Sequence, residues 1–477
     1  MIHRPLVSAC AWAAAVMLSA CASLLPPTQV HAPVAQQWQA PLPHQGTPVA
    51  LAQWWQNQGD PLLARWIEAA QAASPSIAQA QARIASARAT QAQAHSALLP
   101  NVGAQAGASR SVSTPQAPAL ASQSVQLQAS WEVDLVGAGR AANHAAQAQV
   151  QSAQAQWHEA RVSVAAEVAT LYYSLSACQQ ALQIAQADAQ SRQETARLTQ
   201  ITAQAGLTGA ANVALAQAGA AQAQSQLKQQ SAQCDSDIKA LVALTALTEP
   251  ALQAQWAART DKTQHIPAFA ISRVPAQAIS QRPDVYSAER DVVQASAQVG
   301  SAWAQRLPRL SLSGSIGALR LSSAGTSDSG NTWSFGPLAL ALPVFDAGLR
   351  AATLQAAQAA YSAAVVVYQA KVRQAVREVE QALVLLDSAQ VRREHVDTAA
   401  RGYAQSLQAT QARYNQGLAS LMELEEARRY ALTAQLAQAN WRLEHNLAWL
   451  ALYRAVGGGF EPDSVPTPVP TSGPGGA

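Results

Sequence analysis

The sequence predicts a mainly α-helical protein with a few β-strands, built from one structural unit that occurs twice. Two prolines of the first half have counterparts in the second: Pro75 and Pro283 are 208 residues apart, and so are Pro100 and Pro308. Two further motifs repeat at almost the same spacing, with "WEVDLVGAGRAA" (131–142) matching "LPVFDAGLRAA" (342–352) at 212 residues and Gly206-Leu207 matching Gly417-Leu418 at 211. Three sets of anchors at nearly one offset indicate an internal duplication.

Each half is predicted to contain a helix, two strands and two long helices. The segment "VQLQASWEVDL" (125–135) alternates apolar and polar residues, which is typical of a strand with one face buried. We expect strands at about 101–112 and 123–135, and again at about 308–321 and 332–345. The segments "TPQAPAL" and "SSAGTSDSGN" between them are rich in turn residues and are predicted to be loops.

The long helices follow the strands. From about Arg140 to Ala205, and from about Leu349 to Gln416, the chain contains no proline. Apolar residues recur there at steps of three and four, the spacing of a coiled coil. At about 1.5 Å per residue each helix would span roughly 100 Å. Glycines near 206 and 417 are predicted to form the tips of two helical hairpins.

These features predict the organisation of the chain. The first repeat is expected over 61–250, with a linker over 251–274 and the second repeat over 275–455. The Gly/Pro-rich segment 456–477 is predicted to be a disordered tail.

The N-terminus is predicted to be an export signal. Basic residues precede an apolar run that is too short to span a membrane, so residues 1–20 fit a signal peptide. The motif Leu-Ser-Ala-Cys, which ends at Cys21, resembles the bacterial lipobox. We therefore expect Cys21 to carry acyl chains such as palmitate at the start of a lipidated segment 21–60. The alternative is an ordinary signal peptide with an incidental cysteine. Ala22, a non-acidic residue, favours the outer membrane by resemblance to sorted lipoproteins.

Composition excludes several function classes. The formal net charge is +3 and charged residues make up 12 % of the chain, so no nucleic-acid partner is expected. Histidines are scattered, no His/Cys group has the spacing of a zinc site, and no glycine-rich phosphate loop follows a strand. We expect no catalytic residues, no cofactor and no metal, and therefore no enzyme.

Two cysteines of the mature chain are equally far from Gly206. Cys178 precedes this glycine by 28 residues and Cys234 follows it by 28. A hairpin folded at Gly206 would bring both to the same height, which predicts a disulfide in an oxidising compartment. The alternative is a pair of buried free cysteines that act as small apolar residues.

The four predicted strands are too few for a membrane barrel, because the smallest known barrels have about eight. An exported, lipidated chain with alternating strands nevertheless favours a barrel. Sharing it between chains would resolve this conflict, since two copies give eight strands and three give a wider pore. The alternative is a small soluble sheet.

Several motifs resemble the TolC-type outer-membrane channels of tripartite efflux systems, in particular the NodT-type lipoproteins. These motifs are "WWQNQGDPLLARWIEAA" (54–70), "SQRPDVYSAERDVVQASAQVGSAWAQRLPRLSLSGS" (280–315), "LPVFDAGLRAA" and "ARYNQGLASLMELEEAR" (412–428). The resemblance implies a homotrimer with a 12-stranded outer-membrane barrel, four strands from each chain, above an α-helical barrel in the periplasm. It also implies docking of the periplasmic end to an adaptor protein and an inner-membrane pump.

The resemblance further implies a gate at the hairpin tips, where the channel would be closed. The residues in question are Gly206, Asn212, Tyr414, Gly417 and Glu423. The two glycines fit turns, and Tyr414 matches the tyrosine of the family's tip motif. Asn212 and Glu423 have an alternative role, because both residue types stabilise helix N-termini. The chain departs from the best-known pattern, with Ala419 in place of a basic residue and Asn212 in place of an acid.

Two functions are compatible with the sequence. The first is a passive duct that exports small molecules received from a pump. The second is an exported coiled-coil lipoprotein that acts as a structural or adaptor protein without a pore. The presence of two hairpins and a duplicated strand pair favours the duct, whereas the residues do not indicate the cargo.

Overall fold

The computed structural model describes residues 26–42, 54–55, 60–114, 118–259, 269–271 and 275–461. The predicted signal peptide and Cys21 lie outside the described residues. The chain divides into two compact units. The first contains the described parts of Met1–Pro33, Ala80–Gln156 and Asp284–Lys371, and the second contains those of Val34–Gln79, Trp157–Pro283 and Val372–Ala477.

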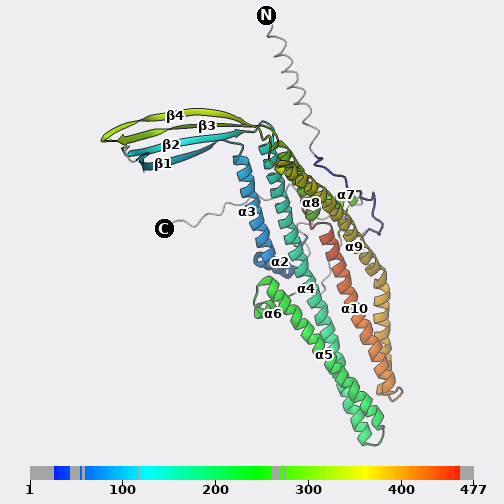
Figure 1. Ribbon diagram of the computed structural model, residues 1–477. Helices are drawn as coiled ribbons and strands as arrows, with labels where there is room; N and C mark the ends of the chain where they lie inside the picture. Colours follow the sequence, from blue (N-terminus) through cyan, green and yellow to red (C-terminus); the bar gives the residue numbers. More distant parts are fainter. Residues whose placement is uncertain are drawn as a thin grey trace. The chain divides into compact units, whose positions relative to one another are not determined.

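The elements follow the duplicated order that the sequence predicts, and the predicted fold class is confirmed (Figure 1). The first half contains α2 (Pro61–Ala73), α3 (Pro75–Ser96), β1 (Asn101–Ser111), β2 (Leu120–Val133), α4 (Ala138–Gln204), α5 (Ala210–Thr245) and α6 (Glu249–Ala257). The second contains α7 (Pro275–Ser280), α8 (Pro283–Ala304), β3 (Arg309–Ser323), β4 (Thr326–Ala341), α9 (Leu349–Asn415) and α10 (Leu421–Ala455). Equivalent helices have almost equal lengths: α3 and α8 have 22 residues each, α4 and α9 have 67, and α5 and α10 have 36 and 35.

An aspartate lies between the preceding strand and each of the two long helices, α4 and α9. Asp134 accepts hydrogen bonds from the backbone N–H groups of Gly139 and Arg140, at 3.2 and 2.9 Å. Asp346 does the same for α9, where the Arg350 N–H donates at 3.2 Å and the Arg350 guanidinium donates at 2.8 Å. The hydrogen bond from Arg350 is the main reason why the pKa of Asp346 is lowered. The repeated aspartates therefore satisfy N–H groups that have no partner within the first turn of a helix.

The four strands form one antiparallel sheet in the order β1-β2-β3-β4. The prediction of a loop over "SSAGTSDSGN" is wrong, because β3 and β4 continue through this segment as paired strands. Their turn is formed by Ala324 and Gly325, whose φ angles of 51° and 83° suit a two-residue hairpin turn. β4 consequently starts at Thr326 rather than at about 332. The Ser, Asp and Gly residues of this segment have the composition of a loop, although the segment is a strand that is stabilised by its pairing with β3.

Small side chains pack the helices of the first unit. Ala87 of α3 lies in one buried cluster with Val150 and Ala153 of α4. Ser152 of α4 hydrogen-bonds Ser287 and Asp291 of α8, at 3.0 and 2.8 Å between side-chain oxygens. Short residues let helix backbones approach closely, and the hydroxyl groups satisfy the polar atoms that become buried there.

An aromatic core fills part of the second unit. Trp66 stacks on Trp256 at 5.7 Å between ring centroids, and Trp54 stacks on Tyr453 at 4.5 Å. Trp256 belongs to α6, so the predicted linker 251–274 begins with helical structure that reaches Ala257. Pro in the first turn starts this helix, and Leu252 and Trp256, four residues apart, bury one face of it.

The residues after α10 also differ from the prediction. Within the predicted tail, residues 456–461 are described, and Phe460 is buried at 3 % exposure. Gly457 has φ 90°, and a Cβ there would lie 2.3 Å from the Gln281 carbonyl oxygen. Glycine is therefore required for close backbone packing at this point. Arg282 donates to the Ala455 carbonyl at 2.8 Å and pairs with Glu378, which secures the end of α10.

Candidate functional sites: the sheet and the hairpin tips

The register of the sheet separates its side chains into two faces of opposite character. We call one the apolar face; its large residues are Val102, Val125, Leu127, Trp131, Val133, Leu310, Leu312, Ile316, Trp333, Phe335, Leu338 and Leu340. We call the other the polar face; it carries Gln105, Ser109, Ser122, Ser124, Gln126, Gln128, Ser315, Thr332 and Ser334. Hydroxyl pairs cross the strands on the polar face, with oxygens 2.8 Å apart in both Ser109–Ser122 and Ser315–Ser334.

The apolar face is open to the surroundings in the single chain. Trp333 is 78 % exposed and Phe335 is 82 % exposed. On β3 the apolar side chains of this face extend from Leu310 to Ala318. At about 3.3 Å per residue this is roughly 26 Å along the strand, or about 20 Å in height at a tilt of about 40°. Membrane barrels carry an outward apolar band about 25 Å tall, so these dimensions suit contact with lipid.

The edges of the sheet are the second notable feature of this site. β1 and β4 lie at its two ends, so each pairs with one strand among the described residues. Exposed backbone N–H and C=O groups along an edge favour pairing with another strand. In hydrocarbon such groups cannot remain unpaired, because no water is available to bind them.

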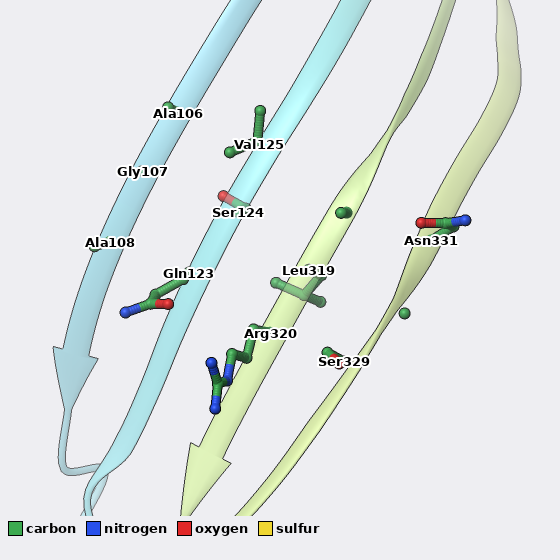
Figure 2. Close-up of a pocket in the computed structure, with 12 residues that line it drawn as sticks. Ala106, Gly107, Ala108, Gln123, Ser124, Val125, Leu319, Arg320, Ser329 and Asn331 are labelled. Carbon is green, nitrogen blue, oxygen red and sulfur yellow. The ribbon is translucent and has the colours of Figure 1, made fainter.

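The hairpin end of the sheet contains a hollow of about 840 Å³ (Figure 2). Its lining includes Gln123, Arg320, Ser329 and Asn331, together with small residues of β1. Gln123 pairs with Arg320, and Arg320 pairs with Ser329, so these three side chains share the apolar face. Polar residues thus replace large apolar ones on this face near the hairpin ends.

The two hairpin tips have the same turn. Gly206 and Gly417 both adopt φ 74°, which glycine tolerates best. The next residue donates back into the helix in both cases: Leu207 N–H to the Thr202 carbonyl at 2.9 Å, and Leu418 N–H to the Arg413 carbonyl at 2.8 Å. This pattern is the Schellman motif that ends many helices. The structure thus places both glycines at the turns of the hairpins.

The returning helices start differently. Ser420 caps α10: its hydroxyl accepts from the Glu423 N–H at 3.2 Å, while the Glu423 carboxylate accepts from the Ser420 N–H at 2.6 Å. The hydrogen bonds from Ser420 lower the pKa of Glu423, and Arg413, 3.7 Å away, adds to the effect. Gly209 caps α5 without a side-chain hydrogen bond. Asn212 lies in the first turn there, and its N–H donates to the Gly209 carbonyl at 3.0 Å.

The structure brings only some of the sequence-predicted tip residues together. Tyr414, Gly417 and Glu423 lie within the second tip, where Tyr414 is half-buried and its carbonyl accepts from the Gly417 N–H at 2.9 Å. Gly206 and Asn212 lie in the first tip. Among the described residues, no hydrogen bond or ion pair joins Asn212 to Tyr414 or Glu423.

Sequence reasoning missed a polar cluster between the two hairpins. Thr195 of α4, 8 % exposed, donates to the Glu425 carboxylate of α10 at 3.1 Å. Arg428 pairs with the same carboxylate and lies 3.4 Å from the Thr195 hydroxyl. The i, i+3 spacing of Glu425 and Arg428 is visible in the sequence. Their partner is 230 residues away, however, and no local pattern indicates it.

A disulfide joins α4 to α5. Cys178 and Cys234 are bonded, with their Cα atoms 5.6 Å apart, and both residues are buried. The Gln230 amide donates to the Cys178 carbonyl at 3.5 Å. A covalent bond and a hydrogen bond therefore join the two helices of the first hairpin near Cys178.

Over the part of the chain that the structure describes, no helix combines the length and apolar character needed to cross a membrane. The same residues contain no group of three or more His, Cys, Asp or Glu side chains arranged to hold a metal ion.

Comparisons with known proteins agree with this geometry. A family model described as outer membrane efflux protein matches residues 66–247 and 274–458. Nodulation protein T of Rhizobium leguminosarum bv. viciae is 28% identical over 431 residues, which cover 88% of this chain and 87% of that one. The pyoverdine export outer membrane protein OpmQ of Pseudomonas putida is 29% identical over 459 residues, or 94% and 96% of the two chains. A solved membrane protein from Pseudomonas aeruginosa superposes with a TM-score of 0.80 at 27% identity, covering 92% of this chain and 98% of that chain.

Proposed function

Because the chain belongs to the outer membrane efflux protein family, we propose that three copies of it form the passive duct of a tripartite efflux system. The protein is an outer-membrane efflux channel whose helices extend into the periplasm. In the proposed trimer each chain contributes four strands to a 12-stranded barrel, and the long helices enclose a periplasmic tube that continues the pore.

The open four-stranded sheet is the observation that carries this proposal. Its apolar face suits lipid, its polar face suits a water-filled lumen, and its two edges need strand partners. Three copies joined edge to edge, β1 of one to β4 of the next, would satisfy all three requirements. A soluble sheet would instead leave Trp333 and Phe335 exposed to water.

We propose that the hairpin tips receive a periplasmic adaptor, which connects the duct to an inner-membrane pump. Leu207 and Leu418, which follow the tip glycines, are 79 % and 65 % exposed. Exposed leucines at the end of each hairpin provide apolar contacts for partner helices. The cargo, a small molecule, would be selected by the pump, because a passive duct with a Ser- and Gln-rich lining has few groups that discriminate between solutes.

We also propose that Cys21 is acylated and anchors the mature N-terminus in the outer membrane. The test is mass spectrometry of the N-terminal peptide of the purified protein. Loss of the lipid mass in Cys21→Ser, with the protein still exported, is the expected result; an unmodified Cys21 would contradict the proposal.

Tyr414 and Glu423 are proposed to help close the periplasmic end, with Asn212 at the other tip and both tip glycines shaping the turns. Glu423 already caps α10, so the two roles must be separated. Glu423→Gln keeps a side chain that can complete the cap but removes the charge. Ser420→Ala weakens the cap but keeps the charge. A charge-held gate predicts larger conductance for Glu423→Gln alone.

The duct itself is tested by single-channel recording in planar bilayers together with native mass spectrometry. We expect step currents and a mass of three chains. A protein that remains monomeric and gives no steps would favour the alternative function, an exported coiled-coil lipoprotein without a pore.

A further inference from the structure

The charged residues of the sheet are distributed unequally between its two faces. The charged residues of the four strands are Arg110, Glu132, Arg309, Arg320 and Asp328. The strand register places three of them, Glu132, Arg309 and Asp328, on the polar face. The apolar face thus carries two positive charges and no negative charge within the strands.

Both arginines of the apolar face lie near the hairpin ends. Arg320 pairs with Gln123, one position beyond the pair formed by Val125 and Ala318 on the same face. Arg110 pairs with Ala121, one position further toward the turn. Because the two arginines are two strands and two residues apart, their Cα atoms are separated by about 12 Å. They therefore border the apolar band on the side away from the helices.

Neither arginine has an ionic partner in the part of the chain that the structure describes. Among the described residues, no hydrogen bond, ion pair or aromatic contact involves Arg110 or Arg320, and both are exposed. Asp328 is close in sequence to Arg320 but projects from the opposite face, because it pairs with Leu321. By contrast, Arg140 and Arg350 are paired with aspartates. These two arginines lie in the first turns of the long helices, at the other end of the sheet.

The neighbourhood of Arg320 is polar and concave. Gln123, Ser329 and Asn331 line the same hollow and share its face (Figure 2). Ala106 and Ala108 of β1 provide a flat surface beside them. This combination offers cationic and neutral hydrogen-bond donors above a smooth apolar surface.

We infer that Arg110 and Arg320, assisted by Gln123, bind the phosphate groups of lipids in the outer leaflet of the membrane. The inference rests on the proposed function, in which the helices lie in the periplasm and the hairpin ends point outward. Acyl chains would then cover the apolar face up to Val125 and Ala318, and the lipid headgroups would meet the next positions. A guanidinium group binds phosphate through two parallel hydrogen bonds, which makes arginine well suited to this place.

A position deeper in the membrane, among the acyl chains, would be unfavourable for these arginines. An arginine on the lipid face is strongly destabilising at the middle of a bilayer and almost neutral near its surface. Two unpaired arginines without an opposing acid therefore fix the depth of the sheet in the membrane. They also favour a lipid with anionic phosphates over a zwitterionic one.

The test uses the full-length channel in nanodiscs of phosphatidylcholine, with and without bisphosphorylated lipid A. We expect lipid A to raise the thermal unfolding midpoint of the wild-type protein and to remain bound in native mass spectrometry. Arg110→Gln/Arg320→Gln should lower the apparent affinity for lipid A roughly tenfold, because each lost guanidinium removes a charge-assisted hydrogen bond. The matched control Lys228→Gln/Arg309→Gln removes the same charge from α5 and from the polar face, and should bind lipid A like the wild type.

The remaining outcomes also decide the question. Equal lipid A binding by both double variants would overturn the inference. Full competition by inorganic phosphate would show a site for the free anion and would likewise overturn it. Single-channel recording in phosphatidylcholine alone separates this inference from the proposed function: conducting trimers without lipid A preference contradict only the inference, whereas non-conducting monomers contradict the duct.

Discussion

The two helical hairpins, α4–α5 and α9–α10, are held together at equivalent heights by different chemistry. In the first hairpin Cys178 is bonded to Cys234, and Gln230 donates weakly to the Cys178 carbonyl at 3.5 Å. The offset of 211 that relates the tips places Ala389 and Trp441 at the positions of Cys178 and Gln230. There the Trp441 indole N–H donates to the Ala389 carbonyl at 2.7 Å.

The difference continues toward the tips. The second hairpin has the ion pair between Arg392 and Glu444, the stacked rings of Tyr403 and Tyr430, and the side-chain cap of Ser420. The first hairpin has Gly209 at the corresponding cap, without a side-chain hydrogen bond. A covalent link therefore replaces several weaker contacts, and the duplicated backbone does not require that the two copies be stabilised alike.

Removing the disulfide should have the largest effect. For Cys178→Ala/Cys234→Ala we expect a loss of about 2–4 kcal/mol in the free energy of opening the first hairpin, because the bond restricts a long loop of the unfolded chain. Hydrogen exchange followed by mass spectrometry measures this opening in α5. Exchange in α10 serves as the internal control, and an equal increase in both helices would show that the hairpins do not open independently.

The indole hydrogen bond of the second hairpin should contribute less. Trp441→Phe keeps most of the buried ring but leaves the Ala389 carbonyl without this donor, which should cost about 1–2 kcal/mol. Faster hydrogen exchange in α10, with α5 unchanged, is the expected result. Trp333→Phe is the matched control, since Trp333 is exposed on the sheet. If Trp441→Phe left exchange in α10 unaltered, the Trp441–Ala389 hydrogen bond would not stabilise the second hairpin as the disulfide stabilises the first.

Loss of the serine cap should affect only the second tip. Ser420→Ala removes the hydroxyl that accepts from the Glu423 N–H, and such losses cost about 1 kcal/mol. We expect faster exchange in the first turn of α10 and no change beyond it. If protection from exchange decreased along the whole of α10, the cap would stabilise the entire helix rather than its first turn alone.

The reverse change at the first tip should give a small gain. Gly209→Ser introduces a cap hydroxyl where the structure has none, and the expected stabilisation is a few tenths of a kcal/mol. The φ of Gly209 is −81°, which serine adopts without strain. Slower exchange in the first turn of α5 is the expected observation, whereas faster exchange would show that this glycine has another role.

Lowering the pH should have the smallest effect, a selective loss of stability at the second tip. The folded-state pKa of Glu423 is lowered, so its contribution is present above the unfolded value, about 4.3, and is lost as the pH falls through the folded value. The effect is small because the Glu423 side chain is half exposed to solvent, which weakens its interactions. Exchange rates measured across this pH range, corrected for intrinsic rates, should increase selectively at the second tip. Glu423→Gln should abolish that selectivity.

The sequence predicts the elements well where a single residue type determines the local backbone. Pro75 and Pro283 start equivalent helices, and Gly206 and Gly417 form equivalent turns, because these residues restrict or extend the accessible φ values. The helix α6 was detectable from its proline and from Leu252 and Trp256 at i, i+4. Most of α6 nevertheless falls within the predicted linker, because a helix of nine residues is too short for a sustained helical pattern.

Features that depend on distant partners could not be predicted in the same way. The β3–β4 turn region has the composition of a loop, and only its pairing partners make it a strand. Phe460 is buried by a surface that the local sequence does not describe. The contact of Thr195 with Glu425 joins residues 230 positions apart. Gly206 and Gly417 lie at the turns, whereas the gating role of Glu423 stays a prediction, because its carboxylate also caps α10.

The equal lengths of α4 and α9, 67 residues each, limit how this protein can evolve. Loss of one residue within either helix would rotate everything beyond it by about 100°, so that every later buried position would point to a different neighbour. Loss of seven residues would restore the direction but shorten the helix by about 10 Å, and the returning helix would have to lose the same stretch. Point substitutions can therefore accumulate separately in the two halves, as Cys178 and Ala389 show, whereas length must be inherited as a matched set.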